Sequence, residues 1–162
     1  MKPEQFIREQ GLDKAREVVA SIPVPQVNFY SLDKNTFLEL PEGYDSSAYL
    51  NANYKVYVSV KDLKRLVESL DRYNKFDSKQ EALDAIDEAP EGATDYRKLS
   101  CGARYIKQGP RFFEYWNGSE WCRPTVPFTV ETHILRFDKL DDLKQAIKDH
   151  ESIYGEEQWV LS

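Results

Sequence analysis

Apolar residues near the N-terminus recur three or four positions apart, which is the spacing of a helix packed on one side. Pro3 fits the first turn of a helix, where its missing N–H costs little, and Gly11 fits the residue just past the end. A second helix is predicted over residues 12–20. Pro23 ends it, because proline cannot continue the hydrogen bonding of a helix. The N-terminal segment therefore predicts a pair of packed helices.

Three further helices are predicted where the same spacing combines with capping residues or follows a strand. Ser59 and Asp62 have the spacing of a capping box, in which the serine hydroxyl accepts a hydrogen bond from a backbone N–H of the first turn. Ser78 and Glu81 repeat this spacing. The predicted helices begin near Ser59, cover residues 79–89 and cover residues 138–150.

Strand patterns lie between these helical segments. Residues 27–32 and 36–40 are separated by Asp33, Lys34 and Asn35, which suits a short hairpin loop. Residues 54–58 form a third strand candidate, rich in β-branched and aromatic side chains. The intervening residues 41–53 contain mixed turn residues and are predicted to be a loop.

The central part of the chain predicts an antiparallel meander. Gly109-Pro110 and Asn117-Gly118 separate runs of alternating residues, and Asn-Gly between such runs is a strong hairpin signal. A longer strand follows the meander. The predicted strands of this part cover residues 103–108, 111–116, 119–123 and 126–137.

If both dipeptides are two-residue turns, the register of the meander can be counted. The expected cross-strand pairs are Lys107 with Phe112, Tyr105 with Glu114, Glu114 with Trp121, Phe112 with Arg123, and Trp116 with Ser119. One face then carries Tyr105, Lys107, Phe112, Glu114, Trp116, Trp121 and Arg123, and the other carries Arg104, Ile106, Arg111, Phe113, Tyr115, Glu120 and Cys122.

The two faces of the meander differ in how easily they can be buried. Lys107 and Arg123 make the first face costly to bury, since an unpaired charge loses its hydration in a core. We therefore expect Ile106, Phe113 and Cys122 to point inward. Trp116 and Trp121 are expected to stay at least partly accessible.

These elements predict an α+β fold with an antiparallel sheet packed by several helices. Residues 90–94 are the best linker candidate, because Pro90 ends a helix and turn residues follow. The chain then divides into residues 1–90, which are helical and mixed, and residues 91–162, which hold the meander and the last helix. These parts form either two lobes or one continuous domain.

Composition narrows the class of protein. The 162 residues carry 28 acidic and 22 basic side chains, for a formal charge of −6, which argues against a general coat for duplex DNA. Residues 91–137 differ, with 5 acidic and 7 basic side chains. Two cysteines, no apolar signal segment at the N-terminus and no apolar run long enough to span a membrane favour a cytoplasmic protein without membrane association.

Catalytic and metal-binding signatures are weak in this sequence. His133 and His150 stand on different predicted elements, and no Cys-x-x-Cys spacing occurs, so we expect no metal and no cofactor. A hydrolase that pairs Cys101 or Cys122 with His133 is the enzymatic alternative, although nothing local marks either cysteine as activated. An acidic surface that mimics nucleic acid is a further alternative, for which a charge of −6 is modest.

The aromatic meander is the candidate binding site. Aromatic side chains interleaved with lysine or arginine on a sheet serve as stacking platforms for single-stranded nucleic acid and equally as hot spots of protein contacts. The third interpretation is purely structural: helices cover one face of the meander, and cation–π pairs occupy the other. The candidate residues are Tyr105, Lys107, Phe112, Trp116, Trp121 and Arg123.

One resemblance to known proteins accompanies these patterns. The opening MKPEQFIREQGLDKAREVV, the later SVKDLKRLVESL, the stretch 89–94 and the hairpin over residues 105–121 resemble segments of small accessory proteins of lambdoid phages and prophages of enteric bacteria. The resemblance covers about half of the chain. It implies a phage or prophage protein in the cytoplasm of an enteric host, and it supplies no activity and no functional residue. By analogy with small phage proteins that bind host proteins such as defence nucleases, we expect a non-enzymatic accessory protein whose partner is a host protein. Single-stranded nucleic acid is the alternative partner.

Overall fold

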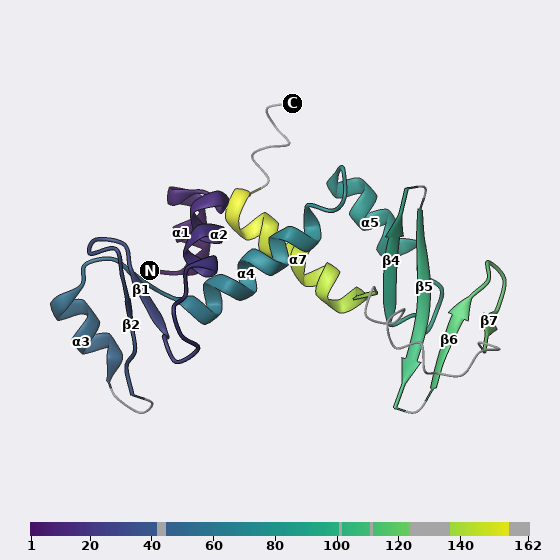
Figure 1. The fold of residues 1–162 in the computed structure, drawn as a ribbon. Coiled ribbons are helices and arrows are strands. Elements are labelled where there is room, and N and C mark those ends of the chain that lie inside the picture. The colour runs from purple at the N-terminus through teal and green to yellow at the C-terminus, as the bar shows by residue number, and fades with distance from the viewer. Residues whose placement is uncertain (42–44, 101, 111, 124–136, 156–162) are drawn as a thin grey trace. The chain divides into compact units, whose positions relative to one another are not determined.

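The computed structural model describes residues 1–41, 45–100, 102–110, 112–123 and 137–155. In these ranges the chain forms helices and two antiparallel sheets, one of three strands and one of five (Figure 1). The predicted α+β fold is confirmed. The predicted strand over residues 126–137 lies outside the described residues except for Phe137. His133 and Cys101 also lie outside them.

The chain forms two compact units. The first contains residues 1–70 together with the chain from Asp149 onward, and the second contains residues 71–148. The division therefore falls inside two helices, whereas Pro90, the predicted boundary, lies within the second unit. There the N–H of Ala93 donates to the carbonyl of Pro90 at 3.0 Å, in a turn that leads from a helix directly into a strand of the same unit.

The helices of the first unit begin with the predicted pair, α1 (Pro3–Gln10) and α2 (Leu12–Ala20). Gly11 between them has a φ of 91°, which a residue with a side chain rarely adopts. Phe6, Ile7, Ala15 and Val18 face the core of this unit.

The first unit also contains a small sheet of three strands. It has the order β2-β1-β3, with β1 (Phe29–Ser31), β2 (Thr36–Leu38) and β3 (Tyr57–Ser59) paired antiparallel. The predicted hairpin is confirmed. Asn35 turns it with a φ of 47°, a conformation that asparagine tolerates better than most residues.

The predicted loop over residues 41–53 is wrong, because helix α3 (Ser46–Asn53) occupies most of it. The carboxylate of Asp45 caps this helix and accepts a hydrogen bond from the N–H of Ala48. Only Leu50 of α3 is buried, so the sequence carries no stripe of apolar residues that would announce a helix.

Two long helices contribute residues to both units. In α4 (Val60–Tyr73) the hydroxyl of Ser59 accepts a hydrogen bond from the N–H of Asp62 at 3.3 Å, as the capping spacing predicts. The other is α7 (Leu140–Tyr154), which contains most of the predicted last helix. The residues of the first core that these helices supply are Val60, Leu63, Leu66, Val67, Leu70 and Ile153.

The second unit is built on the larger sheet, with strand order β7-β6-β5-β4-β8, whose strands β4 to β7 lie side by side in Figure 1. Its strands are β4 (Asp95–Leu99), β5 (Gly102–Gly109), β6 (Phe112–Trp116), β7 (Trp121–Cys122) and β8 (Asp138–Lys139). Helix α5 (Lys79–Asp87) precedes β4, and Ser78 caps it by accepting from the N–H of Glu81 at 3.1 Å. The predicted helix with its Ser78 cap is confirmed.

Side chains from one face of this sheet and from the helices form the second core. Tyr96 of β4 and Tyr105 of β5 lie opposite each other and pack with residues of α5 and α7. The buried members of this core are Tyr73, Phe76, Ala82, Ala85, Tyr96, Tyr105, Leu140, Leu143, Ala146 and Ile147.

Candidate functional site

The meander forms as predicted, but its register differs by two residues at both turns. Gly109 pairs with Phe112 and Lys107 with Glu114, so Pro110 is the first residue of the loop rather than the second. Proline presets the backbone for the first central position of a turn and is disfavoured at the second, which the predicted register had required.

The second turn is longer than predicted because Asn117 organises it. Trp116 pairs with Trp121, so residues 117–120 form the loop. The side-chain oxygen of Asn117 accepts hydrogen bonds from the N–H groups of Ser119 and Glu120, at 2.8 and 2.9 Å. An asparagine that closes its own turn in this way outweighs the tight Asn-Gly hairpin.

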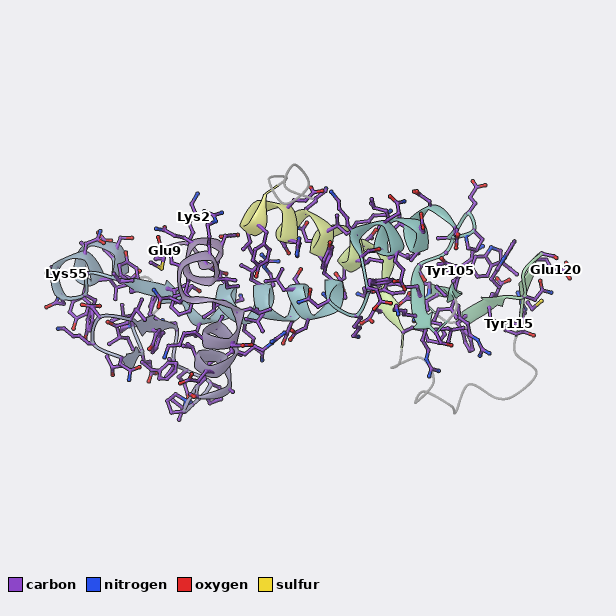
Figure 2. The ribbon with its side chains drawn as sticks, turned by 90° about the horizontal axis from the view of Figure 1, so that it is seen from above. Lys2, Glu9, Lys55, Tyr105, Tyr115 and Glu120 are labelled. Atoms are coloured by element: carbon purple, nitrogen blue, oxygen red, sulfur yellow. The ribbon has the colours of Figure 1, made fainter. Side chains whose placement is uncertain are left out.

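A slip of two residues leaves each side chain on its predicted face, because side chains alternate with period two along a strand. We define the inner face as the one that contributes to the second core and the outer face as its opposite. The pairing places Tyr96, Lys98, Ala103, Tyr105, Lys107, Glu114, Trp116 and Trp121 on the inner face, and Arg97, Arg104, Ile106, Gln108, Phe113, Tyr115 and Cys122 on the outer face. Tyr105 and Tyr115, on opposite faces, are labelled in Figure 2.

The face expected to stay outward is the one that packs on the helices. Tyr105 is 7% exposed, and its hydroxyl donates to the backbone carbonyl of Ala85 in α5. The indole N–H of Trp121 donates to the carbonyl of Glu91 at 3.1 Å. Lys107 does not oppose this packing, because its ammonium lies 5.7 Å from the centre of the Trp121 ring at the margin of the core.

The remaining predicted site residues are divided between packing and exposure. Trp116 and Trp121 contact each other, with ring centres 5.3 Å apart, and both are half-buried, as expected. Arg123 is exposed and follows β7, while the backbone of Phe112 pairs with Gly109. The structure thus brings Tyr105, Lys107, Trp116 and Trp121 together on the inner face.

On the outer face, Ile106 is buried as expected, whereas Phe113 and Cys122 are only half-buried. The expectation that these three residues point into the core is therefore wrong, because all three lie on the face opposite the second core, although Ile106 is buried there. Cys122 is a free thiol that accepts a hydrogen bond from the side-chain amide of Asn117 at 3.2 Å.

The outer face contains a hollow of about 460 Å³ with aromatic and cationic walls. Its volume lies in the range of pockets that hold ligands. Tyr115 at its rim is 41% exposed, among the most exposed large apolar side chains of the described residues. The hollow is lined by Arg97, Arg104, Ile106, Phe113, Tyr115 and Phe137, and also by Tyr105 and Trp116, which the pairing assigns to the inner face.

Two arginines stand directly opposite each other beside this hollow. Arg97 of β4 pairs with Arg104 of β5 in the ladder, and across the described ranges neither forms an ion pair or a side-chain hydrogen bond. Like charges at directly opposite positions of a sheet destabilise it. We therefore take the hollow with its arginine pair as the candidate site.

Of the residues that line the hollow, sequence reasoning predicts only Tyr105 and Trp116 as site residues. It places Arg104, Ile106, Phe113 and Tyr115 on the other face of the meander, and it misses Arg97 and Phe137. Residues 95–99 read Asp-Tyr-Arg-Lys-Leu, which is too polar to mark a strand, so Arg97 was not placed on the sheet. The sequence feature that indicates a strand here is the alternation of Tyr96 with its charged neighbours Asp95 and Arg97, directly before the meander.

A second hollow, of about 500 Å³, lies where the turn after α5 meets the start of α7. Its lining mixes both charge signs, with Asp95 and Asp141 beside Lys139 and Lys144. Asp141 and Lys144 pair with each other at 4.0 Å. Because both charge signs line this hollow, it favours neither an anionic nor a cationic ligand.

Comparison with known proteins gives no relative for this chain, since no family model, no curated protein and no solved structure matches it. In the part of the chain that the structure describes, no group of three or more histidine, cysteine or acidic side chains gathers to hold a metal. Within those same ranges no helix is long and apolar enough to cross a membrane. The Cys–His pairing of the hydrolase hypothesis requires His133, which lies outside the described residues.

Proposed function

We propose that this chain is a non-enzymatic accessory protein of a phage or prophage that acts in the cytoplasm of an enteric host by binding a host protein. The contact surface in this proposal is the outer face of the five-stranded sheet. The observation that supports it is the opposed pair Arg97 and Arg104, without described ion-pair partners, next to the exposed ring of Tyr115. Tyrosine and arginine are the residue types that most often carry the binding energy of protein interfaces.

The charge distribution supports a protein partner over a nucleic acid. The whole chain carries −6, so its net charge repels the phosphate backbone of a nucleic acid, although residues 91–137 hold 7 basic and 5 acidic side chains. A protein partner needs only local complementarity at the hollow. The target class that fits a phage accessory protein is a host enzyme, such as a defence or nucleic-acid enzyme, which the bound protein inhibits.

Single-stranded nucleic acid remains the second candidate function. It is favoured by the same outer face, since an arginine pair flanked by aromatic rings also suits phosphates and stacked bases. This binding would weaken steeply with salt, because each phosphate contact releases counterions.

The deciding experiment is affinity capture from an enteric host lysate, with and without nuclease. We expect a protein partner that survives nuclease treatment and is lost with Tyr115→Ala. The matched control is Tyr49→Ala, which removes an exposed tyrosine from α3 of the first unit and should leave capture unchanged. Loss of every partner after nuclease treatment would instead support the nucleic-acid function.

A further inference from the structure

The arginine pair of the outer face opposes the stability of the unit that contains it. Arg97 and Arg104 are direct cross-strand neighbours, so their charges repel each other in the folded state more than in the unfolded chain. Several other cations of this unit have acidic partners: Lys75 lies 3.1 Å from Asp138, and Lys98 lies 3.3 Å from Glu81. The outer-face pair departs from that arrangement.

Asp95, an acidic residue on the same face, does not neutralise the pair. Asp95 lies two residues before Arg97 on β4, is 7% exposed and forms no ion pair with either arginine. With respect to the described residues, the two guanidinium groups therefore keep donors for an incoming anion. Arginine binds a carboxylate through two parallel hydrogen bonds.

The hollow supplies an apolar part beside this charged part. Phe113, Tyr115 and Phe137 contribute rings, and Ile106 contributes a buried floor. A ligand that fills it needs an apolar side chain within a few residues of its carboxylates. A free small anion offers the charge without the apolar group.

We infer that this hollow receives an acidic segment of the partner protein, with one or two carboxylates on Arg97 and Arg104 and a neighbouring apolar side chain against Tyr115. The inference rests on the proposed function and adds the chemistry of the segment that is bound. Charge complementarity to two arginines that have no ion pair among the described residues commits the inference to an acidic protein segment.

The first test identifies what touches the hollow. The photoreactive amino acid benzoylphenylalanine replaces Tyr115, and as a control Tyr49, in the full chain expressed in an enteric host; cross-linked products are then sequenced by mass spectrometry. We expect a cross-link at position 115 to a host peptide that contains at least two acidic residues and an apolar one. A cross-link to a peptide without acidic residues overturns this inference and leaves the proposed function standing. A cross-link to nucleic acid or to a second copy of this chain overturns the inference and removes this support from the proposed function.

The second test separates binding from folding. Arg97→Gln and Arg104→Gln should raise the thermal midpoint by roughly 1–4 °C at low salt, because each removes the repulsion. Each substitution should also weaken the binding of the captured partner about tenfold or more, because a desolvated arginine–carboxylate contact is lost. The matched control is Arg123→Gln, which neutralises an exposed arginine outside the hollow and should change neither quantity.

Either arginine variant that binds the partner as tightly as the unchanged protein overturns the inference. A variant that lowers both the midpoint and the binding also overturns it, because the arginine would then serve the fold. Should the chain capture no protein at all, the proposed function itself fails, which the cross-linking result distinguishes from a wrong segment chemistry.

Discussion

The hydroxyl of Tyr105 in β5 donates a buried hydrogen bond to the carbonyl oxygen of Ala85 in the last turn of α5. Carbonyl groups in the last turn of a helix have no partner within the helix, so the tyrosine satisfies a group that would otherwise be orphaned. One side chain thereby holds the helix to the inner face of the sheet.

This bond predicts a loss of stability when the hydroxyl is removed. Tyr105→Phe should lower the free energy of unfolding by about 1–2 kcal/mol, because the buried carbonyl of Ala85 loses its partner. Urea unfolding at pH 7 measures it. Tyr115→Phe is the control, because its ring is exposed and the loss of its hydroxyl should leave stability unchanged. Equal effects of the two variants would contradict the assignment.

The same tyrosine predicts a decline of stability at alkaline pH. Burial, with a smaller contribution from the Glu88 carboxylate, raises the pKa of Tyr105 to about 12 from an ordinary value of 10.0. The folded state thus favours the neutral phenol, so this stabilisation is complete below pH 10 and is lost as the pH rises from about 10 to about 12. The difference in unfolding free energy between the unchanged protein and Tyr105→Phe should shrink over that window. A difference that grows instead would contradict this sign.

The cap of α5 gives a second stability prediction. Ser78→Ala should cost on the order of 1 kcal/mol, because the N–H of Glu81 loses the serine oxygen that accepts from it. Ser78→Asp keeps an acceptor at the same position and should retain most of the stability. Urea midpoints of the three proteins decide this, and an alanine variant as stable as the aspartate variant would show that the cap contributes nothing.

Arg8 gives a prediction for the first unit. Its guanidinium donates to the carbonyls of Ile153 and Ser152, at 2.8 and 2.7 Å, in the last turn of α7. We expect Arg8→Ala to cost about 1–2 kcal/mol, because two terminal carbonyls lose a charged donor. Lys14→Ala removes only a surface ion pair with Glu17 and should cost less than about 0.5 kcal/mol in the same thermal unfolding series.

Two adjacent residues of β6 provide the sharpest test of the face assignment. Trp116→Ala should lower the free energy of unfolding by about 2–4 kcal/mol, since the half-buried indole packs on the second core. Tyr115→Ala should change stability by less than about 1 kcal/mol and reduce partner capture, because its ring is on the outer face. Circular dichroism and lysate capture measure the two effects. A reversed pattern would place the candidate site back on the inner face.

Local chemistry in the sequence predicts much of this fold. Ser59, Ser78 and Gly11 start or end helices through hydrogen bonds and backbone preferences that involve only neighbouring residues. The alternation along the meander also predicts which residues share a face, and it does so despite the wrong register.

The remaining features depend on contacts that no local pattern contains. Which face meets α5 depends on a bond between Tyr105 and Ala85, 20 residues apart in the chain. Strand β4 is extended because it pairs with β5 and β8. Its own sequence is polar and does not predict a strand. Arg97 became visible only through that pairing, and with it the candidate site.

The first unit is discontinuous in the chain, and this sets an order on its synthesis. Residues 71–148 form one uninterrupted stretch, so the second unit can fold on the ribosome as soon as it has emerged. The first unit is completed later, because the carbonyls that Arg8 binds belong to residues translated about 145 positions after it. Most of its buried core lies within residues 1–70 and can gather earlier, so only the surface that receives Ile153 and the last turn of α7 stays uncovered during that interval.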